Sequence, residues 1–122
     1  AGLRAGQNYM RAGQYGRALD IFEIVVDTEE YDGRGIRAQA LYWSGLSYEK
    51  MMGSMSEGDW KGRGNARNEA YEIYRRITFD FPDSKWAKFA RGRLADPTFE
   101  RKVEQEASKR KRLLEQLEES RK

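Results

Sequence analysis

The chain has 122 residues, of which 39% are hydrophobic and 35% charged, so it suits one folded domain with a modest core and a strongly solvated surface. It contains neither cysteine nor histidine, which excludes disulfides, thiolate nucleophiles and zinc–sulfur sites and removes the side chain most used for acid–base catalysis. Its net charge of +3 comes from 23 basic and 20 acidic residues, a mixed-sign surface that does not favour nucleic-acid binding.

Neither a membrane span nor a targeting signal is visible in the sequence. No stretch approaches the roughly 20 consecutive apolar residues that a span needs. The chain begins with AGLRAG at 1–6 rather than with methionine, so we expect a piece or a processed product of a longer protein. The missing signals therefore carry little weight.

Apolar residues recur three to four positions apart almost throughout, which predicts an all-helical protein. Gly13 suits the end of the first helix, and DGRG at 32–35 interrupts the second. FPDS at 81–84 stops the fourth helix because proline cannot continue it, and Asp83 or Ser84 can cap the next one. The expected helices cover about 2–13, 15–30, 36–52, 66–80, 84–95 and 97–121.

A long loop is expected at about 53–65, GSMSEGDWKGRGN, which holds four glycines and two serines. Its glycines and basic residues lack the GxxxxGK[ST] spacing of a phosphate-binding loop. Trp60 lies inside this segment. It either folds back onto the helices, the simpler expectation, or is a contact for a partner, since tryptophan is enriched at binding hot spots.

One step from a small to an aromatic residue occurs twice: Ala18 precedes Phe22 by four residues, and Ala70 precedes Tyr74 by four. The tyrosine before this step lies 9 residues earlier in the first unit and 22 in the second, so the second carries about 13 extra residues, which coincide with the glycine-rich loop. Alternating small and large residues lets helical hairpins stack. The small residues of the two units are Gly6, Ala18, Gly45 and Ala70.

These units resemble the tetratricopeptide repeat (TPR) family. AGQNYMRAGQYGRALDIFEIV at 5–25 and ALYWSGLSYEKM at 40–51 match the motif in their Gly/Ala, Tyr, Ala and Phe positions. ITFDFPDSKWAKFARGRL at 77–94 is similar to the junction between repeats in bacterial envelope members, such as outer-membrane assembly lipoproteins and the periplasmic cell-division coordinator. The chain departs from the family in its insertion, in Ser44 and in a third unit that never completes.

The resemblance implies a TPR-like α-solenoid of about two and a half helical hairpins, followed by a long C-terminal helix. We expect a repeat domain at 1–96, with the insertion at about 53–65, and a charged helix at 97–122. Because about three units are needed for stability, we expect an excerpt of a longer array, capped at its C-terminal end. Val103, Ala107 and Leu114 would pack over that end, with fraying beyond Leu117.

In such proteins the first helix of each pair lines a concave groove that holds a peptide. The spacing keeps each transferred set on one helical face. Arg11, Lys50 and Arg91 would suit carboxylates or a free C-terminus. The alternative is that these residues face solvent or a neighbouring helix. The expected groove residues are Leu3, Gln7, Met10, Arg11, Tyr42, Leu46, Glu49, Lys50, Ala87, Arg91 and Leu94.

We therefore expect a non-catalytic protein–protein interaction scaffold without cofactor, metal or small-molecule substrate. One alternative is an oligomerisation module that buries Leu113, Leu114 and Leu117 of the last helix. A less favoured alternative is a nucleic-acid binder using KRKR at 109–112, which a solvated helix face explains more simply. The resemblance favours a bacterial periplasmic or envelope location. The sequence does not identify the partner.

Overall fold

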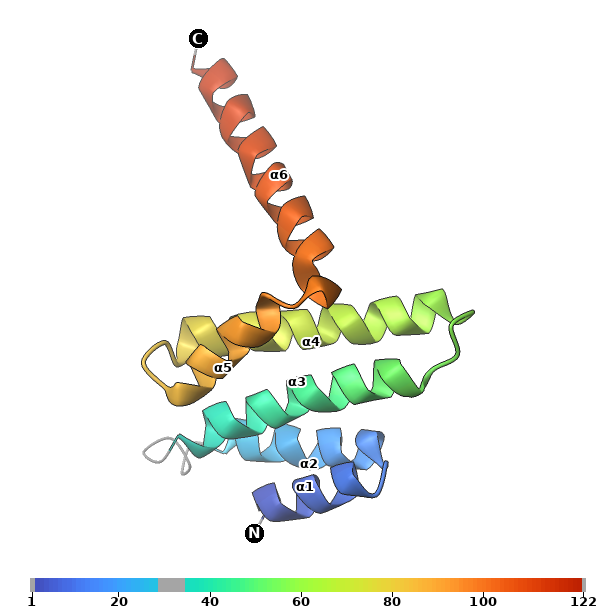
Figure 1. Cartoon of the computed structure of the whole chain (residues 1–122). Helices are drawn as coiled ribbons and strands as arrows, with labels where there is room; N and C mark the ends of the chain where they lie inside the picture. The colour runs from blue at the N-terminus through green and yellow to red at the C-terminus, as the bar shows by residue number, and fades with distance from the viewer. Residues whose placement is uncertain (1, 29–34, 122) are drawn as a thin grey trace.

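The computed structural model describes residues 2–28 and 35–121, apart from the side chains of residues 100–106. Within this part, α1 and α2 form one hairpin, α3 and α4 form a second that stacks on it, α5 lies against α4, and α6 projects away (Figure 1). The all-helical, TPR-like fold is thereby confirmed. The helices are α1 (Gly2–Arg11), α2 (Tyr15–Asp27), α3 (Ile36–Ser54), α4 (Trp60–Asp80), α5 (Lys85–Leu94) and α6 (Pro97–Ser120).

Each hairpin closes where a glycine lies beneath an aromatic ring. A Cβ atom on Gly6 would lie 2.8 Å from Cδ1 of Phe22, and one on Gly45 would lie 2.7 Å from Cζ of Tyr74. Both rings are fully buried. Only glycine leaves room for these rings, so the two helices of each hairpin approach closely at this point.

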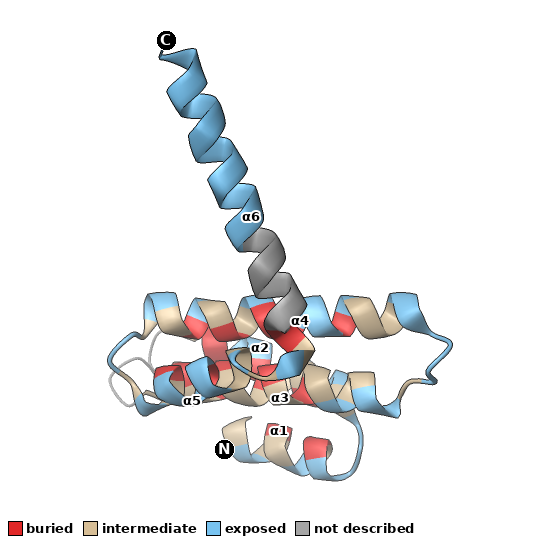
Figure 2. Cartoon of the chain, turned by 45° about the horizontal axis from the view of Figure 1, so that its top comes forward, coloured by how far each residue is buried: buried red, intermediate tan, exposed pale blue. Residues whose placement is uncertain are grey.

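The interior lies between the helices, as Figure 2 shows by the buried residues on their facing sides. Alanines fill the closest approaches, with Ala18 and Ala70 fully buried, and larger apolar side chains fill the rest. Gly13, between α1 and α2, has the left-handed φ of 77° expected for a helix end. The expected break at 32–35 lies mostly outside the described residues. No helix in the described part has the length and apolar character to cross a membrane.

The long loop expected at 53–65 is wrong, because α3 continues to Ser54 and α4 begins at Trp60. Asp59 caps α4 by accepting a hydrogen bond from the backbone N–H of Gly62 at 3.0 Å. The guanidinium of Arg63 donates to the carbonyl oxygens of Met52 (3.1 Å) and Met55 (3.0 Å), near the end of α3. Local capping at both helix ends therefore outweighs the low helix propensity of the glycines.

The start of α6 covers the end of the stack in a way that the sequence did not predict. Asp96 caps the helix through the Thr98 N–H at 2.9 Å, and Phe99 is fully buried against the ring of Tyr74, with ring centroids 5.9 Å apart. The expected packing of Ala107 and Leu114 is wrong, because both are exposed. Phe99 already fills the space against α4, and the helix then leads away from the body. Val103 lies outside the described side chains.

The C-terminal end of α6 is drawn as helix beyond Leu117, and the expected fraying there stays a prediction. The helix continues to Ser120, and the backbone N–H of Arg121 donates to carbonyl oxygens of the last turn. Its residues from 107 to 121 are exposed (Figure 2). The last two turns of α6 are therefore regular helix without contact to the repeat body.

Candidate functional site

The surface between α3 and α5 carries a cluster of aromatic side chains, which we call the aromatic face: Tyr42, Trp86 and Phe89. Ring centroids lie 5.5 Å apart for Tyr42 and Trp86, and 5.9 Å apart for Tyr42 and Phe89. Phe89 is 45% exposed, while the other two are half-buried. Partly exposed, rigid rings of this kind can bury a partner's apolar side chain at low entropic cost.

An ion pair joins α3, α4 and α5 next to the aromatic face. The carboxylate of Glu49 accepts hydrogen bonds from the Tyr74 hydroxyl and from Nε and Nη2 of Arg93, the Nε bond being 3.0 Å long. The Glu49 side chain is only 12% exposed and that of Arg93 34%. This network fixes the position of α5 relative to both helices of the second hairpin.

The ionisation of these groups reflects their surroundings. The hydrogen bond to Glu49 raises the pKa of Arg93 above its ordinary value. Burial, followed by the hydrogen bond to Glu49, raises the pKa of Tyr74 well above the ordinary 10.0. Burial also raises the pKa of Tyr42. The tyrosines therefore stay neutral at physiological pH, and the charge of Glu49 is matched by Arg93.

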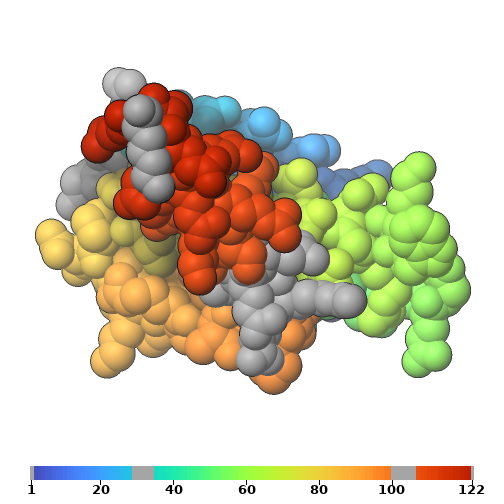
Figure 3. Space-filling view, turned by 90° about the horizontal axis from the view of Figure 1, so that it is seen from above, coloured from blue at the N-terminus to red at the C-terminus, as the bar shows by residue number. Residues whose placement is uncertain are grey.

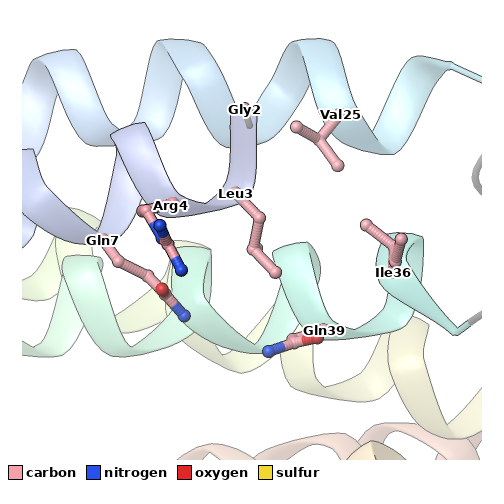
Figure 4. A pocket seen from close by; sticks show the side chains of 7 residues that line it. All are labelled: Gly2, Leu3, Arg4, Gln7, Val25, Ile36 and Gln39. Carbon is pink, nitrogen blue, oxygen red and sulfur yellow. The ribbon is translucent and has the colours of Figure 1, made fainter.

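A cavity of about 310 Å³ lies between α1, α2 and α3. Leu3 of α1 points toward α3, and Val25 and Ile36 border the same space (Figure 4). Gln7 and Gln39 provide polar groups at the cavity. Gln39 precedes Tyr42 by three residues, which puts the cavity and the aromatic face along one side of α3.

The structure separates the expected groove residues into different environments. Leu3 and Gln7 line the cavity, and Tyr42 belongs to the aromatic face. Leu46 is half-buried against the core. The exposed cationic members of the set are Arg11, Lys50 and Arg91.

Three expected groove residues face the interior or are already paired. Met10 is 6% exposed and Ala87 is fully buried, so both contribute to the core instead of a surface. Glu49 is held by the Tyr74 hydroxyl and the Arg93 guanidinium. These side chains stabilise the stack, because their polar or apolar groups are already satisfied by the fold.

The sequence-based alignment missed Trp86, Phe89 and Arg93. It assigned Arg91, which lies about 200° around α5 from Arg93 and makes no ion pair with the described side chains. Aligning Gly92 with Gly45 would have found two of the three: Phe89 then corresponds to Tyr42, three residues before the glycine, and Arg93 to Leu46, one residue after it. Trp86 would correspond to Gln39, which is not in the expected set.

Trp60 is the first residue of α4 and is 78% exposed. The expectation that it folds back onto the helices is therefore wrong, because capping of α4 by Asp59 directs the chain into a helix at that position. Its role as a contact for a partner stays a prediction. Trp60 belongs to the far end of α4 from the aromatic residues of α5 (Figure 1).

A tetratricopeptide repeat model matches residues 39–84, which cover most of α3 and all of α4. No curated protein and no solved structure matches the chain. The match includes Gly45 and Tyr74, the glycine and the ring that close the second hairpin. The chain therefore contains a tetratricopeptide repeat, formed by the hairpin of α3 and α4.

Proposed function

We propose that this protein is a non-catalytic scaffold that binds a segment of another protein along the α1, α3 and α5 side of the stack. TPR repeats generally mediate protein–protein interaction. The observation that supports this site is the aromatic face, where partly exposed Phe89 lies next to Tyr42 and Trp86. An apolar side chain of the partner would be buried there, as at other interface hot spots.

The proposed partner segment carries carboxylates near its apolar anchor. Lys85 places its Nζ 5.0 Å from the ring centre of Trp86, which puts a cation at the edge of the aromatic face. Lys50 is exposed on α3 and Arg11 on α1, whereas Arg91 lies about 200° around α5 from Phe89 and faces away from these rings. Arg93 is matched by Glu49, so the exposed cations would recognise the acidic groups or a free C-terminus.

The proposal extends the sequence-based domain division. The repeat body at 1–96 would bind the partner, and the helix at 97–122 would be separate from that surface. The similarity of residues 77–94 to the junctions of bacterial envelope members is the support for an envelope location. Neither statement is needed for the proposed binding chemistry.

The test is selection of peptides from a displayed library of short random sequences on the 122-residue chain. We expect acidic peptides with an aromatic or long aliphatic residue, bound in the micromolar range, or about −8 kcal/mol. Phe89→Ala should weaken their binding by about tenfold, because it removes the most exposed ring of the aromatic face. Lys50→Ala should weaken acidic peptides more than neutral ones.

The matched control is Phe79→Ala, which removes a 75% exposed phenylalanine from α4. It should leave binding unchanged if the aromatic face is the site. Selected peptides that tolerate Phe89→Ala and Lys50→Ala but lose affinity with Phe79→Ala would overturn the proposal.

A further inference from the structure

The far half of α6 exposes an apolar stripe that no described part of the chain covers. Leu113, Leu114 and Leu117 are 53%, 57% and 56% exposed. Figure 3, which looks at the molecule from the side of α6, shows these turns standing in front of the other helices. Three leucines within two turns, at the far end of a 24-residue helix, form a surface suited to another helix.

Charges flank this stripe in a definite order. Residues 109–112, KRKR, precede the leucines, and Glu115, Glu118 and Glu119 lie among and after them. Lys111 and Glu118 are seven residues apart, so they lie on the same side of the helix, about 20° from exact alignment. Both lie beside Leu114, and the midpoint between them along the helix axis is at the height of Leu114.

We propose that two copies of this chain associate through antiparallel pairing of their α6 helices, centred at Leu114. With the two-fold axis at that level, Lys111 of each copy meets Glu118 of the other, and the leucines meet across the axis. In a parallel pair the two-fold axis would put Lys111 and Glu118 of the two copies on opposite flanks of the seam, where they do not meet. The charge order is therefore self-complementary in the antiparallel orientation alone.

A second copy explains this surface better than a lipid membrane or a nucleic acid. An anionic membrane or a polyanion would attract KRKR at 109–112 but would repel Glu115, Glu118 and Glu119 on the next turns. The pairing does not depend on what the aromatic face binds. The leucines of each copy, Leu113 to Leu117, span less than one heptad, so the dimer is weak and dissociates at low concentration.

The first test is sedimentation velocity of the full 122-residue chain from about 1 μM to about 1 mM. We expect a monomer–dimer equilibrium that Lys111→Glu or Glu118→Lys weakens by about tenfold, because symmetry places each change in the dimer twice. The double variant, Lys111→Glu with Glu118→Lys, should restore association. Folding is checked by circular dichroism, since the exposed positions are outside the core.

The matched control is the pair Arg112→Glu and Glu119→Lys. These residues are also seven apart and charged in the same order, but they lie on the side of α6 away from Leu114. We expect the control variants to dimerise as the wild type does. If the control and test variants lose dimerisation equally, the effect is one of general charge, and the specific pairing of Lys111 with Glu118 is overturned.

The orientation is tested by single cysteines, since the natural chain has none. In an antiparallel pair, Leu114→Cys crosslinks to its copy on oxidation, whereas Ala107→Cys lies about 22 Å from its copy and does not. In a parallel pair both would crosslink. A chain that stays monomeric to about 1 mM, or that dimerises with both cysteines crosslinking, would overturn the proposal. Binding to anionic vesicles or DNA without dimerisation would overturn it as well.

Discussion

In the α1–α2 hairpin the ring of Phe22 lies over Gly6, and in the α3–α4 hairpin the ring of Tyr74 lies over Gly45. The contact is the same, but Tyr74 adds a hydroxyl that donates to Glu49, which also binds Arg93 of α5. The first hairpin closes through apolar packing alone at this point. In the second, the same ring also joins the repeat to the next helix of the stack.

The third unit shows what happens when the ring is missing. Gly92 of α5 can be aligned with Gly45 of α3 in the sequence, but it is exposed, and a Cβ atom on it would meet no described atom of another element within 4 Å. The helix that follows, α6, inserts Phe99 against Tyr74 and then leads away (Figure 1). Within these helices, glycine is therefore required where a second helix brings a ring over it, as at Gly6 and Gly45.

The largest predicted effect comes from adding a methyl group at each of these three glycines. Gly6→Ala and Gly45→Ala should each lower the free energy of unfolding by about 2–3 kcal/mol, because the new Cβ overlaps a buried ring. Gly92→Ala should raise it by about 0.5–1 kcal/mol through helix propensity. Urea denaturation measures all three. Equal effects at the three sites would contradict the comparison.

The next prediction removes the carboxylate that distinguishes the second hairpin. Glu49→Ala should lower the free energy of unfolding by about 2 kcal/mol, since it leaves the buried Tyr74 hydroxyl without its acceptor and Arg93 with only its longer, 3.7 Å contact to Asp96. Asp80→Ala is the control, because it breaks an exposed ion pair with Arg76 that is worth at most about 0.5 kcal/mol. If urea unfolding shows that both variants lose the same free energy of unfolding, the Glu49 network does not stabilise the stack.

Tyr74→Phe makes the second hairpin resemble the first. It should lower the free energy of unfolding by about 1.5 kcal/mol at neutral pH. The pKa of Tyr74 is raised in the folded state, so its contribution is complete below the unfolded value near 10.0 and is lost as the pH rises above it. Wild-type stability should then fall by up to about 1.4 kcal/mol per pH unit from this group. Urea midpoints at rising pH measure this loss. A difference between wild type and variant that stays constant through alkaline pH would contradict the assignment.

Helical periodicity and the repeated small-to-aromatic step were enough to predict the fold. Helix ends were predicted less well: composition indicated a loop at 53–65, because the cap formed by Asp59 and the contacts of Arg63 depend on tertiary geometry. Of the expected groove residues, Tyr42 contacts the ring of Trp86 and Gln7 lines the cavity, and their role in binding stays a prediction. Arg91 was assigned in place of Arg93 because the third unit was aligned without using Gly92 as its reference.

The central claim, that the aromatic face is the binding surface, is tested most directly by the three tryptophan indole N–H signals in nitrogen-15 NMR spectra. A peptide from the displayed library is titrated, and each signal is assigned by a Trp→Phe variant. We predict a saturable shift of the Trp86 signal, because that ring lies beside Tyr42 and Phe89, and an unchanged Trp60 signal. A shift of Trp60 with an unchanged Trp86 would place binding at the start of α4 and contradict the account.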